Sequence, residues 1–339
     1  MGRLGNSEWR ASIVTRNPEQ TPVFIDDDFS RRQLLAGAAG LGTAMLATGA
    51  IGEDNQPAPA ATQFKYCLNT STIRGQKLSV PEQIDLAAKA HYDAIEPWLG
   101  DLHKHVETGG NLADLKKRLA DRGLVVASAI GFAEWIVDDD TRRDAGLEVA
   151  KKDMAVIAQV GGTHIAAPPA GATKATNLNL AIVAERYRAL LEIGAKEGVI
   201  PELELWGFST TLSKLSEVMT VAIEARHEQA CVLLDVYHLY KGGSDFSGLR
   251  LLAGAALPCI HMNDYPATPP RAEIKDSDRI MPGDGVAPLT QILRDLTAIG
   301  FRGALSLELF NANYWKDDPH GVAQIGLLKM KEAVAKALA

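Results

Sequence analysis

Four apolar segments in the second half of the chain carry acidic or imidazole side chains, which can bind metal ions and transfer protons. In an extended strand, successive side chains point to opposite faces. This alternation puts each of these side chains on one face, while the neighbouring leucines occupy the other. The segments are IPELELWG, ACVLLDV, CIHMND and ALSLELF, and the residues are Glu204, Asp235, His261 and Glu308.

Three carboxylates held close together repel one another by several kcal/mol at low effective dielectric, unless a cation or a proton is shared among them. Any one of these acids alone fits a helix cap or an ion pair, and a single histidine fits hydrogen-bonded packing. The four together favour a divalent metal. Three oxygen ligands and one imidazole suit Mn²⁺, Mg²⁺ or Co²⁺, with Zn²⁺ as a further candidate.

Two further segments place polar or aromatic groups beside these strands. In LLDVYHLYKGG, Asp235 and His238 are three residues apart, so in a strand they would point in opposite directions. We therefore expect different roles: Asp235 on the metal, and His238, beyond the strand, on the substrate. In AIEPWLGD, Glu96 beside Trp98 suits a sugar, which needs hydroxyl acceptors and a flat apolar wall. Packing explains the tryptophan equally well.

The elements that must position these residues alternate between short apolar runs and longer amphipathic ones. Eight predicted strands are each followed by a helical stretch, which predicts a parallel (β/α)8 TIM barrel whose carboxyl-terminal strand ends share one rim. An open doubly wound sheet is the alternative, but the first strand is followed by NTSTIRG, without a G-x-G-x-x-G loop. The strands are predicted within residues 64–72, 94–99, 124–132, 164–169, 200–207, 230–236, 259–264 and 304–310.

Two helical stretches have clear sequence signals. In residues 141–162, Thr141 is a predicted cap and Gly161 a predicted stop. In residues 111–123, three leucines fall on one face and Gly123 ends the helix. After the seventh strand comes the longest irregular stretch, residues 265–288, and a loop of this length in a compact domain is usually functional.

Composition narrows the classes of function. The 339 residues are 46% hydrophobic and 23% charged, with a net charge of -7, so the chain can bury a large core and lacks the excess of positive charge typical of nucleic-acid binding. Cys67, Cys231 and Cys259 fall in predicted buried strands. We interpret them as small packed side chains without a disulfide or zinc role.

The first sixty residues differ from the rest. Arg31 and Arg32 precede an uncharged, glycine-rich run from Leu34 to Gly52, which resembles a twin-arginine export signal. Cleavage near Ala60 would follow, and a retained membrane anchor is the alternative. We expect a leader at residues 1–62, a catalytic barrel at residues 63–339, and export to the periplasm or another extracytoplasmic location, without stable membrane insertion after cleavage.

The motifs LNTSTIRG, LELWG, DVYH, HMNDYP, RIMPGDG and LSLELF resemble those of the xylose-isomerase-like barrel superfamily, in its sugar isomerase and epimerase branch. The resemblance implies one divalent metal held by Glu204, Asp235, His261 and Glu308, with both glutamates acting as the acid/base pair. It also implies that Arg279 and His238 contact the substrate. His261 and Arg279 are further apart here than in ketose epimerases, which favours the inosose-isomerase side of the branch.

We therefore expect an isomerase or epimerase of a keto-sugar, an inosose or a related carbohydrate. Such an enzyme removes a proton next to a carbonyl and stabilises the enediolate with the metal. The alternatives are a lyase or dehydratase acting on an oxidised sugar or 3-keto-glycoside, and a carbohydrate-binding protein without activity. A DNA-repair nuclease of the same fold would need three zinc ions and a basic face. We expect no nucleic-acid partner, and the choice between monomer and homo-oligomer stays open.

Overall fold

Eight parallel strands form the centre of the protein in a computed structural model that describes residues 64–176 and 178–339. Their order is β3-β2-β1-β8-β7-β6-β5-β4. The Ala166 N–H, in β4, donates to the Ala129 carbonyl beyond β3 at 2.8 Å, which joins the two outer strands and closes the barrel. The strands are β1 (Lys65–Asn69), β2 (Ala94–Glu96), β3 (Val125–Val126), β4 (His164–Ala167), β5 (Ile200–Glu204), β6 (Val232–Asp235), β7 (Cys259–Met262) and β8 (Ala304–Leu307).

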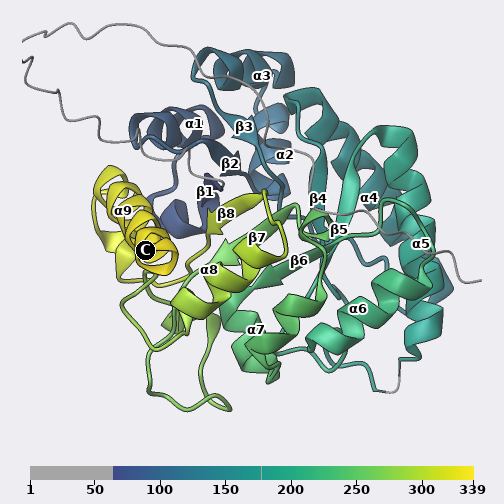
Figure 1. The fold of residues 1–339 in the computed structure, drawn as a ribbon. Coiled ribbons are helices and arrows are strands. Elements are labelled where there is room, and N and C mark those ends of the chain that lie inside the picture. The colour runs from purple at the N-terminus through teal and green to yellow at the C-terminus, as the bar shows by residue number, and fades with distance from the viewer. Residues whose placement is uncertain (1–63, 177) are drawn as a thin grey trace, which may run out of the picture. The chain divides into compact units, whose positions relative to one another are not determined.

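Helices follow every strand and surround the strands in Figure 1. The second βα unit has two helices, and in the sixth a short helix is followed by two 3₁₀ turns, η2 (Phe246–Leu251) and η3 (Gly254–Ala256). The predicted TIM barrel is therefore confirmed. The helices are α1 (Val80–Lys89), α2 (Leu99–Glu107), α3 (Leu112–Asp121), α4 (Asp140–Val160), α5 (Leu180–Glu197), α6 (Leu215–Glu224), α7 (Val236–Gly242), α8 (Leu289–Ala298) and α9 (Pro319–Leu338).

The export signal and the boundary expected near residue 62 lie outside the described residues. Within residues 64–176 and 178–339, none of the helices combines the length and apolar character that crossing a bilayer requires.

Local signals place most helix ends, with one correction. Helix α4 is capped by Asp139, whose carboxylate accepts from the Arg142 N–H, and not by Thr141, because the cap lies two residues earlier than predicted. Gly161 ends it with a φ of 87°, in the left-handed region that favours glycine. On α3, the three predicted leucines are all buried.

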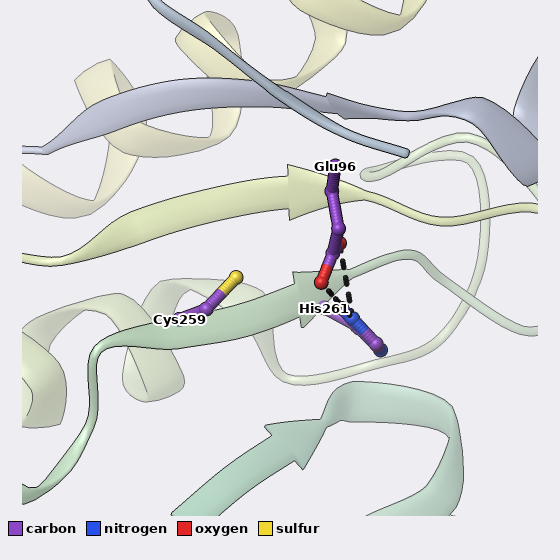
Figure 2. Close-up of side chains that lie close together, drawn as sticks. All are labelled: Glu96, Cys259 and His261. Carbon is purple, nitrogen blue, oxygen red and sulfur yellow. Dashed lines mark hydrogen bonds and ion pairs between the residues drawn. The ribbon is translucent and has the colours of Figure 1, made fainter. Parts of the chain in front are cut away.

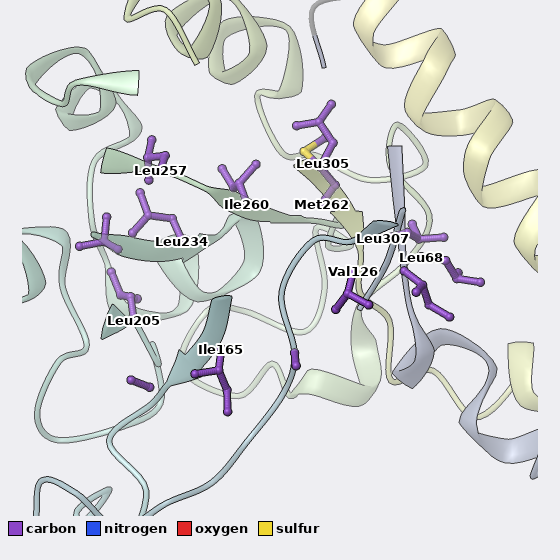
Figure 3. Packing of buried hydrophobic residues seen from close by; sticks show 14 of the residues in the cluster. Leu68, Val126, Ile165, Leu205, Leu234, Leu257, Ile260, Met262, Leu305 and Leu307 are labelled. Carbon is purple, nitrogen blue, oxygen red and sulfur yellow. The ribbon is translucent and has the colours of Figure 1, made fainter. Parts of the chain in front are cut away.

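The strands separate two apolar regions of different character. On their outer face, large side chains pack under the helices, as Figure 3 shows for Ile260 and Met262 of β7 and Leu305 and Leu307 of β8. Inside the barrel lies a second cluster made largely of small side chains: Cys67, Ala94, Ile130, Ala166, Leu233, Cys259 and Ala304. The cysteines at 67, 231 and 259 are free and buried, as expected.

Gly194 marks a close approach between α5 and the strand that follows it. A Cβ at this position would lie 2.3 Å from the Val199 carbonyl oxygen and 2.7 Å from Cδ of Pro201. We predict that Gly194→Ala lowers the free energy of unfolding by about 1–3 kcal/mol, because backbone must shift to admit the methyl group. The measurement is the thermal unfolding midpoint.

Gly100, in α2, is the matched control because a Cβ there would meet nothing within 4 Å. Gly100→Ala should leave the midpoint unchanged or raise it, since alanine restricts the unfolded chain. Equal destabilisation by both variants would contradict the assigned contact.

Candidate metal centre and substrate cavity

The polar side chains form a layer directly above the small residues inside the barrel. Four of the polar residues follow a small neighbour by two positions, as in the pairs Ala94 and Glu96 or Cys259 and His261, whereas Glu204 follows the buried Glu202 and Asp235 follows Leu233. Strand alternation therefore points both members of a pair into the barrel. Small side chains below leave room for the layer above, whose members are all buried: Asn69, Glu96, Glu204, Asp235, His261 and Ser306.

His261 lies at the centre of the carboxylates. Its Nδ1 is 3.1 Å from Oε2 of Glu308, 3.5 Å from Oδ2 of Asp235 and 4.0 Å from Oε1 of Glu204. The ligand atoms of Asp235, His261 and Glu308 all lie within 4.8 Å of one another, and Glu204 stands at the margin of this group. The structure thus brings the four residues together, three of them more closely than the fourth.

The group fits a divalent cation on two observations. The Nδ1 atom of His261 is buried and makes no well-formed hydrogen bond, although three carboxylates face it. Metal bonds of about 2.0–2.2 Å place neighbouring ligand atoms about 3–4 Å apart, which is the spacing seen here. We propose that His261 binds through Nδ1, with the three carboxylates as the other ligands.

Glu96 contacts Nε2 of His261, the ring nitrogen that does not face the other three carboxylates, and Figure 2 shows this contact as dashed lines. Its Oε1 is 3.2 Å from Nε2 of His261, while Ser306 and Asn69 donate to Oε2 at 2.6 and 2.8 Å. Expected on the substrate, Glu96 is fully buried, with its oxygens occupied by protein groups. In this position it fixes the orientation and tautomer of the imidazole, a role typical of the carboxylates behind metal-binding histidines.

Glu96, Cys259 and His261 also lie close enough to form a metal-binding group. Two observations speak against that use. Burial, followed by the charge of Glu96, raises the pKa of the Cys259 thiol well above its usual range, which disfavours the thiolate that a metal would need. In Figure 2 only Glu96 is joined to the histidine.

The buried charges shift one another's pKa values. Burial raises the pKa of Glu204 to about 8. Burial also opposes the charge on Asp235, but the guanidinium of Arg279 holds the pKa of Asp235 well below its usual range. For His261, burial opposes protonation, yet the charges of Glu308 and Glu96 raise its pKa. The raised pKa of His261 thus reflects the negative charge that faces its ring, which a bound cation would also balance.

Arg279 is the cationic side chain of this layer and is fully buried. Its Nη1 donates to Oδ2 of Asp235 at 2.8 Å and to Oε2 of Glu308 at 2.7 Å, and its Nη2 lies 2.9 Å from Nε2 of His238. These contacts occupy both terminal nitrogens with protein groups, while Nε has no hydrogen-bond partner. Arg279 also lines the cavity above the metal site, so it is within reach of a substrate.

The carboxylate of Asp264 stabilises the loop that carries Arg279. Asp264 accepts hydrogen bonds from the backbone N–H groups of Tyr265, Gly283, Gly285 and Ala287 at 2.7–3.0 Å. A Cβ on Gly285 would lie 2.3 Å from Oδ1 of Asp264, which accounts for glycine there. The motif PGDG is therefore a carboxylate-binding turn that places Arg279 over the site.

His238 lies on helix α7, directly beyond the end of β6. Asp235 caps α7, because its Oδ1 accepts from the His238 N–H at 2.9 Å. Burial, followed by the charge of Arg279, lowers the pKa of His238 to about 4, so the ring is neutral. An arginine can only donate, so Nε2 accepts and the proton lies on Nδ1, which has no partner.

A cavity of about 240 Å³ lies over this layer, and Glu204, Glu308, His238 and Arg279 line it. Trp98 also lines it, and its Nε1 donates to Oδ1 of Asn69 at 3.1 Å. The sequence analysis named Trp98 but missed Asn69, at the end of β1, and four further aromatic side chains that line the cavity. The four aromatic residues come from segments that follow different strands. They are Phe132, Trp206, Phe208 and Phe310.

The family model described as the xylose isomerase-like TIM barrel matches residues 84–333. The chain belongs to this family. Among solved structures, it is similar to the IolI protein with a bound zinc atom, with a TM-score of 0.74, 21% identity, and coverage of 81% of this chain and 99% of that one. A structure of L-ribulose 3-epimerase gives a TM-score of 0.66 at 18% identity, covering 81% and 96%.

Curated relatives include two kinds of enzyme. An inosose isomerase of Bacillus velezensis is 24% identical over 257 residues, covering 75% of this chain and 91% of that protein. A 3-dehydroshikimate dehydratase of Pseudomonas putida is 23% identical over 237 residues, or 70% of this chain. The chain spans only 37% of the dehydratase's length.

Removing one proposed ligand should weaken metal binding. In Asp235→Asn the amide keeps an acceptor for the α7 cap but loses the charge, so we predict a fall in Mn²⁺ or Zn²⁺ affinity larger than the roughly 10–100-fold typical of residues behind the ligands. Isothermal titration of the metal-stripped protein measures it. Asp317→Asn, on the exposed surface, is the control, and equal affinities in the two variants would contradict the proposed ligand.

Glu96 offers a test of ligand orientation. Glu96→Gln keeps the size of the side chain but weakens the contact to Nε2 of His261, and we predict a loss of roughly 10–100-fold in metal affinity. The bound metal should remain one per chain. If affinity is unchanged while the thermal midpoint falls, Glu96 supports the fold and does not orient the histidine.

Proposed function

We propose that this chain is a divalent-metal-dependent isomerase or epimerase of a keto-sugar, an inosose or a related carbohydrate. The observation that carries the proposal is that only two of the four proposed ligand residues reach the cavity. Glu204 and Glu308 line the cavity, whereas Asp235 and His261 are fully buried and are not among the cavity residues. Two carboxylates from β5 and β8 therefore meet a substrate from different sides of the barrel.

This arrangement suits proton transfer at a carbon next to a carbonyl. One glutamate accepts the proton and the other returns it, either to the opposite face of the same carbon or to its neighbour. When bound, the metal supplies positive charge that stabilises negative charge on the substrate oxygens. The Nδ1–H of His238 is free to donate to a substrate oxygen, and Trp98 provides a flat wall for the ring.

A lyase or dehydratase is the second candidate. It begins with the same proton removal but then expels a substituent from the adjacent carbon. The similarity to 3-dehydroshikimate dehydratases over 70% of this chain supports it, and so does the fold of a probable 3-dehydroshikimate dehydratase from Bacillus anthracis, at a TM-score of 0.65. Both candidates use the same two glutamates, so their products separate them.

Reaction in deuterated water tests both candidates. With metal-loaded protein and a panel of keto-sugars and inososes, we predict solvent deuterium in an isomeric product. Glu204→Gln, assayed at a metal concentration that saturates the variant, should lower exchange by roughly 10²–10⁴-fold, because the amide cannot accept the proton. Nuclear magnetic resonance follows both the label and the product.

Glu134→Gln is the matched control, since this glutamate pairs with Arg142 outside the cavity. An unsaturated product or a released substituent would replace the isomerase proposal with the lyase. Binding of the panel without exchange or product would instead identify a carbohydrate-binding protein.

A further inference from the structure

Five aromatic side chains form a continuous arc along the cavity. In order they are Phe310, Trp98, Phe132, Trp206 and Phe208, and the ring centroids of successive members are 6.0, 5.2, 6.1 and 5.2 Å apart. They follow strands β8, β2, β3 and β5, so the arc crosses much of the rim. Asp276 and Arg279 contribute charged groups to the same cavity, and the Arg279 guanidinium lies 5.0 Å from the ring centroid of Phe310.

The arc continues beyond the buried layer to the cavity mouth. Phe132 and Phe208 are each 45% exposed, although they are large apolar side chains. Trp98 is held in place, because Asn69 binds its Nε1 and the guanidinium of Arg74 lies 4.2 Å from its ring centroid. An exposed apolar surface that continues into a cavity is typical of a ligand groove.

The volume of the cavity limits how much of a ligand it can enclose. Sites for drug-sized molecules measure about 300–1,000 Å³, and this cavity, at about 240 Å³, takes a single sugar or cyclitol ring. A substituent on the ring, remote from the carbons that face Glu204 and Glu308, must leave through the mouth. There it meets Phe132 and Phe208, which offer flat apolar faces.

We propose that the substrate ring carries a planar apolar substituent, such as an aryl group, which stacks on Phe132 and Phe208. The inference rests on the proposed function for the position of the sugar ring and adds the class of conjugate. Continuity of the arc with the cavity is the reason to choose this occupant over a second copy of the chain. A free sugar would cover Trp98 and leave the outer rings in water.

Binding of two matched probes tests the inference. The phenyl and methyl β-glycosides of 3-keto-glucose share their polar ring and differ only in the substituent. Titration of the metal-loaded full chain should give tighter binding of the phenyl probe by roughly 10-fold, through stacking and apolar burial. The Phe132→Ala and Phe208→Ala variants should reduce this ratio to about 1–3-fold, and Phe132→Leu should give an intermediate ratio because it keeps apolar area without a ring.

Leu251→Ala is the control: it also removes an exposed apolar side chain, 88% exposed and not among the cavity residues, and should leave the ratio unchanged. Equal binding of both probes by the unaltered protein would overturn the inference. So would an unchanged ratio in the Phe variants accompanied by a smaller oligomer in analytical ultracentrifugation, which would assign the mouth to a second copy. If the protein prefers the phenyl probe but shows no turnover, the proposed function is contradicted, whereas the proposed binding site for the substituent is supported.

Discussion

Concentrated negative charge around one imidazole is the constraint on which the rest of the site depends. Glu204, Asp235 and Glu308 face Nδ1 of His261, and Glu96 faces Nε2. Buried carboxylates are stable only when paired or hydrogen-bonded. Neighbouring groups meet this requirement in the structure: Asn263 donates to Asp235, while Asn69 and Ser306 donate to Glu96, and Arg279 bridges two of the acids. Much of the rim therefore serves to hold Glu96, Asp235 and Glu308 in place.

Strand alternation made much of this layer predictable. The period of two placed Glu204, Asp235, His261 and Glu308 on inward faces, and the repeated βα pattern gave the barrel. The depth of each side chain within the barrel was not predictable in the same way, because it depends on how far neighbouring strands are staggered. Glu96 ends its strand as expected but lies below the cavity, paired to Ser306 of β8. No pattern within one segment reveals that partner.

The aromatic arc shows a second limit of sequence reasoning. Phe132 and Phe310 end two of the predicted strands and Phe208 follows a third, and an aromatic side chain at such a position carries no clear signal. Closure of the barrel brings the rings of Phe132 and Phe310 to 5.2 and 6.0 Å from that of Trp98. The loop after β7 was recognisable as functional by its length, whereas its fastening by Asp264 depends on four backbone N–H groups, which a sequence does not display.

The two carboxylate oxygens of Asp235 have different roles: Oδ1 caps α7, and Oδ2 faces His261 and Arg279. The local opening of α7 and the integrity of the charge layer are therefore thermodynamically linked. A cation held by Asp235 would order the same carboxylate that begins the helix, and would therefore disfavour fraying of a segment only seven residues long. His238, which lies on that segment, would then be held more rigidly without contacting the ion.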